Sequence, residues 1–489
     1  MNRFRYGASL LLLVFVLIIT GCSNSSDGAG EKSASAKEVK GTTGLSKDEI
    51  SNEAFKDLFP LQYNSYMKNE KMEDTKYNGS VKRSKYDPDK EPLLPVLFNG
   101  YGFATEYNED RGHVYALEDI RDVKRITDKS VGSCYTCKST AVPQMIEEMG
   151  DDYWGANFNK DIWPKGEAMG HSPIGCSDCH DPETMDLRVT RPSFYKALEA
   201  QGVDTSNPTK NDMRSYVCGQ CHVEYHFAAD NSEVTFPWDN GFKPEEMYEY
   251  YNTIAKEEGF EKDWVHNISG APMLKAQHPE FETHASGTHG KANVSCADCH
   301  MPYERVDGKR KITSHYWTSP LKTMDTSCGQ CHGDRDLDKL KDRVIEIQDA
   351  NVSALHEAQD ISTTAHYYIN KMITSGVSQE RIKQAQEFVR KGQWFWDIVA
   401  AENSSGFHNP QGSMDSLRES IVQSNNAIRL ATEELVKKGV SIEEVNSEIE
   451  KAKTAVKAET VNEKKKDHAL NSYFPAQQPV VPAVQAVKK

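Results

Sequence analysis

The chain has 489 residues and a formal net charge of −15 at neutral pH, and hydrophobic residues make up only 37% of it. This acidic charge argues against nucleic acid as a partner, because neutralising phosphates requires a basic face. The length would allow about two or three ordinary domains. The mean hydropathy of −0.68 is polar for cores of that size, so the fold needs another source of apolar surface.

An apolar run near the N-terminus is typical of a signal peptide. Arg3 and Arg5 precede residues 8–19, which are apolar but too few for a comfortable transmembrane helix. We therefore expect an exported protein, outside the cytoplasmic membrane in the periplasm or at the cell surface.

The residues after this run resemble a bacterial lipobox. In the string Ile-Thr-Gly-Cys, Cys22 would become the lipidated N-terminus and residues 1–22 a lipoprotein signal peptide. The alternative is a leader that is cleaved elsewhere, with Cys22 incidental. Residues 23–46, rich in Ser, Gly, Ala and Lys, predict a flexible tether.

Ten of the 11 cysteines form five C-x-x-C pairs, numbered here as motifs 1 to 5 in chain order. Motifs 2 to 5 are followed by His, the attachment signal of c-type haem, in which two thioethers hold the porphyrin and the imidazole binds iron. Motif 1 is followed by Lys, which suggests a different job for one haem of five. The residues are Cys134, Cys137 and Lys138; Cys176, Cys179 and His180; Cys218, Cys221 and His222; Cys296, Cys299 and His300; and Cys328, Cys331 and His332.

Zinc ribbons and redox dithiols also use C-x-x-C pairs. A zinc ribbon has no need for a His directly after the second cysteine, and here that His occurs four times. Motif 1 alone would leave haem and its alternatives open, but its four neighbours favour haem. Five macrocycles would also supply the missing apolar surface of the core.

The chain divides by character near residue 335. Residues 47–335 predict a pentahaem-binding catalytic region, rich in loops, in which successive motifs start 42, 42, 78 and 32 residues apart. Residues 336–465 predict long helices, one running to Gly376 and others over 378–401 and 413–438. We expect a mainly α, multihaem cytochrome c fold: a haem-packed, loop-rich N-terminal region followed by long C-terminal helices.

The C-terminal region carries two further expectations. Its apolar stripe would pack on a neighbouring helix or on a second subunit, which permits a dimer interface there. The aromatic residues Trp394, Phe395 and Trp396 are interpreted as packing rather than chemistry. Residues 466–489 predict an extended or disordered tail.

The axial ligands decide what each haem can do. A haem with two histidine ligands can only relay electrons, because neither face is open to substrate. The chain has 16 histidines, four of them in the motifs, so 12 remain to complete four irons. Lys138 could bind iron only as a neutral amine, which requires burial and the pull of the metal, and it would leave the opposite face open. The alternative is that Lys138 is solvated and its iron finds another ligand.

Several strings together resemble the pentahaem cytochrome c nitrite reductases, which form ammonium. Beside the five motifs, these strings are RGHVYALEDIRDVKR at 111–125, CGQCHVEYHF at 218–227, PMLKAQHPEFET at 272–283 and HGKANVSCADCHMP at 289–302. The resemblance covers roughly residues 55–440 and implies that the haem of motif 1 is the catalytic centre.

The resemblance also implies a distal pocket above that haem, made of Arg125, Tyr225 and His278. Arg121 is a competitor for the position of Arg125. Arg125 would hold nitrite through forked hydrogen bonds, Tyr225 would donate a hydrogen bond, and His278 would deliver protons near neutral pH as a general acid.

The same family implies the distal histidines of the other irons. They would be His315 for motif 2, His113 for motif 3, His408 for motif 4 and His289 for motif 5. A calcium ion is also implied, bound by side-chain oxygens of Glu224 and Gln277 and by backbone carbonyls of Tyr225 and Lys275.

Two histidines stay outside this scheme. His226 would either add a titrating group near the pocket or face outward, and outward is the favoured interpretation. His284 has no assigned role.

The resemblance implies reduction of nitrite to ammonium by six electrons. The implied donor is a membrane quinol-oxidising multihaem cytochrome, near which a lipid anchor would hold the enzyme, and a homodimer is expected. Two alternatives stay open: an electron conduit with no substrate, and a reductase that acts mainly on sulfite or hydroxylamine.

Overall fold

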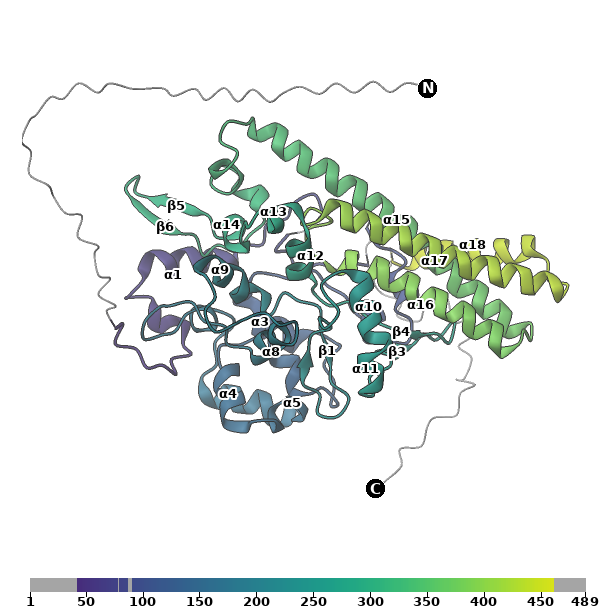
Figure 1. Ribbon diagram of the computed structural model, residues 1–489, viewed down its shortest axis with the longest axis horizontal. Coiled ribbons are helices and arrows are strands. Elements are labelled where there is room, and N and C mark those ends of the chain that lie inside the picture. Colours follow the sequence, from purple (N-terminus) through teal and green to yellow (C-terminus); the bar gives the residue numbers. More distant parts are fainter. Residues whose placement is uncertain (1–41, 78, 87–89, 461–489) are drawn as a thin grey trace, which may run out of the picture. The chain divides into compact units, whose positions relative to one another are not determined.

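The computed structural model describes residues 42–77, 79–86 and 90–460. The predicted leader with Cys22, most of the predicted tether and the predicted tail lie outside the described residues. From Thr42 onward the chain belongs to one compact unit. The described part is mainly helical with a few short strands, as the sequence predicts (Figure 1).

The region before residue 336 is built from short elements. Its α-helices have four to ten residues, because Pro and Gly recur between them and end each run early. They are α1 Pro60–Met67, α2 Leu94–Leu97, α3 Ala116–Asp122, α4 Val142–Met149, α5 Asp152–Gly155, α6 Trp163–Met169, α7 Cys176–Cys179, α8 Pro192–Ala200, α9 Lys210–Gly219, α10 Pro244–Asn252, α11 Ile254–Glu257, α12 Glu280–Ser286, α13 Thr288–Lys291 and α14 Cys296–His300.

Single-turn helices and three small ribbons complete this region. The 3₁₀ helices are η1 Asn52–Phe55, η2 Lys68–Glu70, η3 Gly102–Ala104, η4 His113–Tyr115, η5 Gly132–Tyr135, η7 Pro320–Lys322 and η8 Cys328–Gln330, and η6 Phe158–Ile162 is a π-helix. Each ribbon has two antiparallel strands: β1 His226–Phe227 with β2 Val234–Thr235, β3 Trp264–Val265 with β4 Pro272–Met273, and β5 Tyr303–Val306 with β6 Arg310–Thr313.

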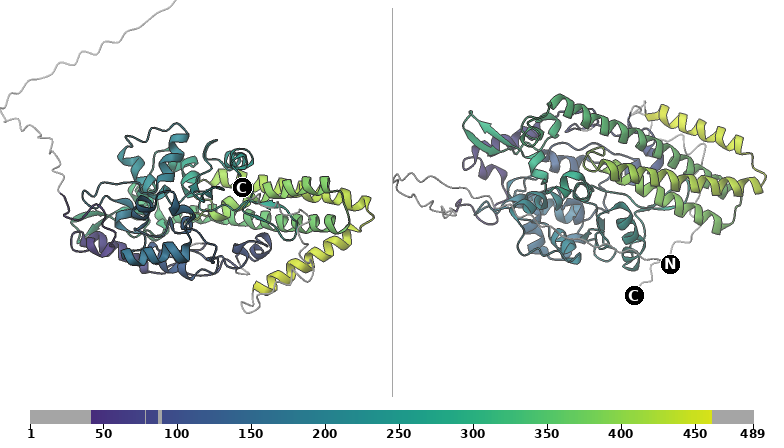
Figure 2. Two further views of the ribbon diagram at one scale, coloured as in Figure 1. Left: turned by 90° about the horizontal axis from the view of Figure 1, so that it is seen from below. Right: turned by 45° about the horizontal axis from the view of Figure 1, so that its top comes forward.

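Four long helices follow: α15 Leu337–Thr374, α16 Gln379–Ala401, α17 Pro410–Lys437 and α18 Ile442–Thr460. The first three pack side by side along their length (Figure 2). Their bounds agree with the predicted helices, except that α17 begins three residues early. Asn409 accepts a hydrogen bond from the Gly412 N–H (3.0 Å), and Pro410 suits the first helical position because it needs no N–H partner there.

Local signals fix the ends of α15. The Asp336 side chain accepts the N–H groups of Asp338 (3.0 Å) and Lys339 (3.4 Å) and so caps the first turn. At the other end Gly376 has φ +67°, and the Val377 N–H reaches back to the Met372 carbonyl. This left-handed turn is one that Gly adopts without steric cost. None of the helices in the described part of the chain is both long and apolar enough to span a bilayer.

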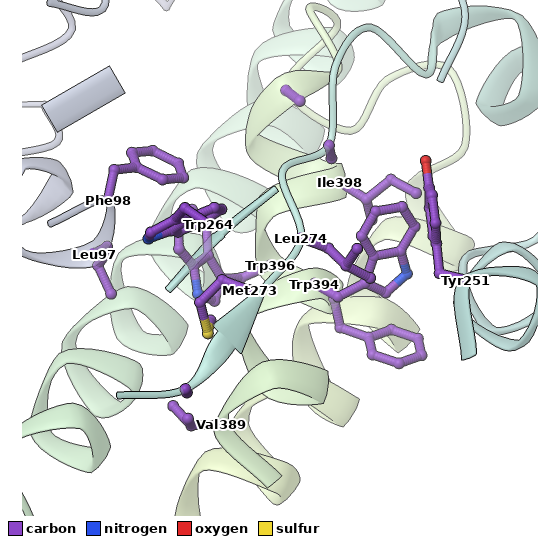
Figure 3. Close-up of a cluster of buried hydrophobic side chains, with 14 of the residues drawn as sticks. Leu97, Phe98, Tyr251, Trp264, Met273, Leu274, Val389, Trp394, Trp396 and Ile398 are labelled. Carbon is purple, nitrogen blue, oxygen red and sulfur yellow. The ribbon is translucent and has the colours of Figure 1, made fainter. Parts of the chain in front are cut away.

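The main core joins the long helices to the short elements. Trp394 and Trp396 on α16 are fully buried, and Trp396 packs against Phe98 just after α2 with ring centroids 5.8 Å apart (Figure 3). The Trp394 indole donates to the Pro244 carbonyl at the start of α10 (2.8 Å). The prediction that these aromatics serve packing is confirmed, and α16 is therefore the link between the two regions.

We predict that Trp396→Ala lowers the free energy of unfolding by about 3–5 kcal/mol, because it leaves a cavity where the indole packed. Thermal and denaturant unfolding of the haem-loaded protein would measure this change. Leu58→Ala is the control, since Leu58 is 45% exposed. Equal losses for the two variants would contradict the assignment of the core.

Candidate haem-binding and catalytic site

Motif 1 lies on a turn rather than on a regular helix. Cys134 is in η5, and the Lys138 N–H donates to the Tyr135 carbonyl (3.0 Å). This turn brings Cys134, Cys137 and Lys138 to one short segment. Its backbone carbonyls then become available to a side chain from another part of the chain.

That side chain is Arg191, which is fully buried at the start of α8. Its guanidinium donates to the carbonyls of Thr136 (2.9 Å) and Ser139 (2.8 Å), which flank Cys137 and Lys138. It also donates to the Asp178 carboxylate in motif 2 (2.6 Å). One planar cation therefore fixes the turn of motif 1 and ties it to motif 2.

Motifs 2 and 4 form the first turns of α7 and α14. Both carry Asp at the third position, and its carboxylate accepts the N–H of the residue before the motif: Gly175 for Asp178 and Ser295 for Asp298, each at 2.8 Å. This cap supports a helix of a single turn. Motif 3 ends α9, which begins with a capping box of Thr209 and Asp212, and motif 5 lies on η8.

The motifs are not arranged in space in their chain order. The Cys137 and Cys221 thiols contact each other, which places motif 1 beside motif 3. Cys218 contacts Cys296 in the same way, so motif 4 lies on another side of motif 3. Cys299 of motif 4 is close to Cys328 of motif 5, and Cys179 of motif 2 is close to Cys221. Motif 3 is therefore the branch point, with motifs 1, 2 and 4 as its neighbours.

The structure brings each distal histidine implied by the resemblance beside its motif. Ring centroids lie 6.3 Å apart for His180 and His315, 5.9 Å for His222 and His113, and 6.2 Å for His300 and His408. Two imidazoles on opposite sides of one metal would have centroids about 6 Å apart, because metal–nitrogen bonds are about 2 Å long. For motif 5, His332 lies close enough to His289 to lower its pKa, after the larger effect of burial.

The protonation of three of these rings also suits iron. Burial lowers the pKa of His113 to about 3 and the pKa values of His300 and His315 to about 4. These imidazoles are therefore uncharged at neutral pH, which is the form that binds a metal. Burial also acts to lower the pKa of His222, but the Glu280 carboxylate outweighs it and raises this pKa to about 9.

The cysteines of the motifs stay partly accessible. None of the ten is in a disulfide and none is fully buried. The His222 side chain keeps 43% of its surface accessible, although burial is the first influence on its pKa. Both observations hold together if these side chains line internal spaces. The free cysteine pairs, the facing imidazoles and the thin helical shell define a multihaem c-type cytochrome.

Tyr225 and Arg125 lie near the cysteines of motif 1. Burial raises the pKa of Tyr225, and the thiols of Cys137 and Cys134 add to the rise, so the phenol is electrostatically coupled to the cysteines. Arg125 acts on the same pKa in the opposite direction. The Arg125 guanidinium lies 4.0 Å from the centre of the Phe103 ring, and its buried Nε has no hydrogen-bond partner among the described residues.

Arg121, the competitor for this position, is occupied elsewhere. It is exposed, donates to the Asn159 side chain (2.9 Å) and lies over the Trp163 ring at 5.0 Å. The geometry therefore favours Arg125 for the pocket.

His278 belongs to the same cluster. Burial lowers its pKa to about 4, the carboxylates of Glu280 and Asp110 act against this effect, and Lys138 adds to it. His278 is thus uncharged at neutral pH, so an imidazolium acting as general acid, as expected from the ordinary pKa of histidine, does not fit this environment. Asp110 was not foreseen from the sequence. Burial acts to raise its pKa, but the neighbouring His278, Lys138 and Arg125 side chains outweigh burial and lower it.

The residues expected to bind calcium are in mutual contact. The Gln277 N–H donates to Glu224 (2.5 Å), the Gln277 amide donates to the Lys275 carbonyl (3.0 Å), and the Tyr251 hydroxyl donates to Glu224 (2.9 Å). Glu224 is fully buried, not on the surface where its type alone would put it. Burial raises its pKa well above the ordinary range, because burying the ionised carboxylate costs free energy. A bound cation would offset that cost.

This oxygen-rich group fits a hard cation. No cluster of three or more His, Cys, Asp or Glu side chains that could hold a metal occurs in the described ranges, and one carboxylate with carbonyl oxygens is instead a donor set of the calcium type. The Lys275 side chain is held apart from it. Its ammonium contacts Asp397 of α16 (2.8 Å), and both side chains are 1% exposed.

Two histidines that the sequence left open now have places. His226 does not face outward: it is 5% exposed, because it packs among Tyr250, Tyr251 and Phe260, with its Nε2 3.1 Å from the Tyr250 hydroxyl. The outward interpretation was wrong. His284 lies 5.8 Å from His408 between ring centroids, beside motif 4.

Comparison with known proteins agrees with this architecture. The family model for cytochrome c552 matches residues 51–485. The cytochrome c nitrite reductase subunit NrfA of Nitratidesulfovibrio vulgaris Hildenborough is 41% identical over 456 residues, covering 87% of this chain and 85% of that one. Cytochrome c-552 of Bacteroides thetaiotaomicron is 37% identical over 406 residues, covering 81% and 79%.

A solved structure is also similar. The cytochrome c nitrite reductase from Desulfovibrio desulfuricans, whose catalytic subunit has two calcium sites, matches with a TM-score of 0.78 and 36% identity over 89% of this chain and 98% of that chain. The chain belongs to the cytochrome c552 family, and the resemblance to cytochrome c nitrite reductases and the multihaem fold are confirmed.

Sequence analysis missed several residues that shape this site. Arg191, Asp397 and Asp110 carry no motif and would pass for ordinary surface charges. Trp317 was missed too, although its ring lies 4.7 Å from His113 and 6.4 Å from His315. Only the proximity of these residues across the fold reveals them.

We predict that Arg191→Lys perturbs motif 1 selectively, because a lysine cannot donate to both carbonyls and to Asp178 at once. The haem of motif 1 should load incompletely or change its spectrum, as followed by mass spectrometry and paramagnetic resonance. Arg191→Met should also destabilise the protein by about 3–5 kcal/mol, since Asp178 loses its buried partner.

The matched control is Arg188→Lys. Arg188 donates to the Ser177 carbonyl in motif 2 (3.1 Å) and is half-buried. If both variants perturb the same haem to the same degree, Arg191 has no special role at motif 1.

Proposed function

We propose that this protein is an oxidoreductase that reduces nitrite to ammonium at motif 1. The observation that carries the proposal is the asymmetry of the five motifs. Motifs 2 to 4 each have a second histidine ring facing the first, and His289 lies near His332 of motif 5, whereas motif 1 has Lys138 and a cluster of polar side chains. The relative named cytochrome c nitrite reductase, which is 41% identical, supports the same activity.

We assign the haem of motif 1 to Cys134, Cys137 and Lys138, which would hold it through two thioether bonds and an amine. When bound, this haem supplies an iron that takes up a nitrogen ligand and passes electrons to it. Lys138 would bind as a neutral amine on one side. The side that faces Arg125, Tyr225 and His278 is then left for substrate.

The pocket side chains have separate roles in this proposal. Arg125 holds the anion, because its guanidinium stays charged and its Nε is free for a hydrogen bond. Tyr225 keeps its proton, since burial raises its pKa, and its hydroxyl donates a hydrogen bond to an oxygen of the substrate. His278 is uncharged at neutral pH. Its ring N–H donates a hydrogen bond to the substrate, and the ring passes on protons one at a time.

The stoichiometry explains why these groups must act together. Nitrite takes up six electrons and eight protons to give ammonium and two waters, and nitrogen must stay bound until the last step. The cationic Arg125 also offsets the chain's net charge of −15 where an anion must enter.

We assign a calcium ion to Glu224, Gln277, Tyr225 and Lys275, through the oxygens named above. Its role would be structural and electrostatic. It would fix the backbone on both sides of Tyr225 and next to His278, and it would add positive potential near the pocket. The Lys275–Asp397 contact would hold the same segment from the side of α16.

Motifs 2 to 5 would carry the electron relay. The imidazoles that would hold these four haems are His180 with His315, His222 with His113, His300 with His408 and His332 with His289. Because motif 3 touches motif 1, electrons would reach the catalytic iron through motif 3.

The setting of the enzyme completes the proposal. A lipid at Cys22 and the tether over residues 23–46 would hold the protein outside the cytoplasmic membrane, in the periplasm or at the cell surface. A quinol-oxidising multihaem cytochrome would supply electrons there, and the region 336–465 would form the interface of a homodimer.

The decisive experiment is spectroscopy of the purified five-haem protein with and without nitrite. We predict that one ferric haem of the five is high-spin and becomes low-spin when nitrite binds. We also predict that ammonium is the product of turnover. In Lys138→Ala this haem should change its spectrum and nitrite turnover should fall at least about 100-fold, because the catalytic iron loses its lysine ligand. Five six-coordinate low-spin haems would instead favour an electron conduit, and faster turnover of sulfite or hydroxylamine a different substrate.

We predict that Glu224→Gln weakens calcium binding by about 10-fold or more, because the site loses its one carboxylate. Calcium content and calcium titration of the holoprotein would show this, and a chelator should lower nitrite turnover of the wild type. The control is Glu233→Gln, which removes a carboxylate that pairs with the exposed Lys196 (2.9 Å). Unchanged calcium affinity in Glu224→Gln would refute the assignment.

A further inference from the structure

Glu402 differs from the other groups that face the ring nitrogens of the haem histidines. The Nδ1 atoms of His180, His315 and His300 lie 2.8, 3.0 and 3.2 Å from the backbone carbonyls of Met185, Thr313 and Thr318. The Nδ1 atom of His408 instead lies 2.6 Å from the Glu402 carboxylate. Three rings therefore face a neutral oxygen, and His408 faces a carboxylate.

The Glu402 carboxylate is held in place by its own turn. It lies directly after α16 and is 3% exposed. The Ser404 N–H donates to one of its oxygens (3.1 Å) and the Ser404 hydroxyl to the other (2.6 Å), and the His408 N–H donates to Ser404 (2.8 Å). This loop between α16 and α17 thus delivers His408 and its carboxylate partner as one unit.

The Nδ1 atom of His408 is close to the Glu402 carboxylate, but its angle does not meet the geometry of a standard hydrogen bond. A rotation of the ring about its Cβ–Cγ bond would align Nδ1 with Glu402. Even without that rotation, a carboxylate so close to the ring places negative charge beside the ligand. Both effects act in the same direction on a metal held by the other nitrogen.

That direction follows from the chemistry of the ligand. A carboxylate that accepts the Nδ1–H gives the imidazole more basic character, so its other nitrogen donates more strongly to iron. Strong donation and nearby negative charge both favour ferric iron, which carries the higher charge, over ferrous iron. A backbone carbonyl polarises its imidazole less, so the haem next to Glu402 is the harder one to reduce.

We propose that Glu402 is a positioning residue that lowers the reduction potential of the motif 4 haem by acting through His408. The proposal rests on the assignment of His300 and His408 as the ligands of that haem. Motif 4 lies between motif 3 and motif 5. With its reduction potential lowered, the motif 4 haem would be reduced after the haems of these two neighbours.

A comparison inside the chain sharpens the inference. The carboxylate of Glu280 lies near His222 of motif 3, but at 3.7 Å, and its other oxygen accepts the Asn403 amide (2.6 Å). Asn403 is the neighbour of Glu402 on the same loop. Of the two carboxylates, only that of Glu402 is in direct contact with its ring nitrogen, at 2.6 Å against 3.7 Å for Glu280.

The test is a potentiometric titration of the five-haem protein with the variant Glu402→Gln, followed by absorbance and low-temperature paramagnetic resonance. One low-spin haem should shift to a higher midpoint potential, and its resonance should move with the weaker axial ligand, while the other four stay in place. Glu402→Asp keeps the charge but withdraws it by one methylene, so it should give a smaller shift of the same haem.

Glu434→Gln is the matched control, because Glu434 is a partly buried carboxylate of α17 that pairs with Arg381 (3.1 Å). The proposal is overturned if the Glu402 variants load five haems with unchanged potentials, or if all five potentials shift alike, as a change of overall charge would produce. These readouts do not depend on turnover, so they separate this inference from the proposed reduction of nitrite.

Discussion

The buried guanidinium of Arg191 is the interaction on which the arrangement of the active-site turn depends. It satisfies the two carbonyls that flank Cys137 and Lys138 and at the same time neutralises Asp178 in motif 2. A turn of this kind has no helix of its own to hold its lysine. The constraint therefore comes from another segment, and a planar cation with several donors can supply it where a single point charge could not.

The long helices contribute to the site as well as to the core. Through Asp397, α16 fixes the ammonium of Lys275, and through the loop that follows, it delivers Glu402 and His408. A protein with so little apolar sequence cannot build a separate catalytic domain. Packing α16 against the short elements gives one body in which the helices and the residues proposed to bind calcium and haem hold one another in place.

The residues around motif 1 differ in charge from the chain as a whole, whose net charge is −15. The chain is strongly acidic, yet the cluster around motif 1 contains the cationic Arg125 and an uncharged His278. Burial keeps that histidine neutral and keeps Tyr225 protonated, so the pocket offers hydrogen-bond donors rather than mobile charges. Such a pocket can bind a small anion and still release a cationic product.

The sequence by itself determined the five attachment motifs, the exceptional lysine, the mainly helical fold and the bounds of the long helices, because these depend on neighbouring residues and on local caps. The resemblance supplied the proposed distal ligands, which no spacing could give. Only the tertiary structure decided that motif 3 is the branch point, that His226 and Glu224 are buried, that Arg191 joins motifs 1 and 2, and that Glu402 contacts His408. Each of these facts requires segments far apart in the chain to meet, and the free energy of that packing is not written in any local pattern.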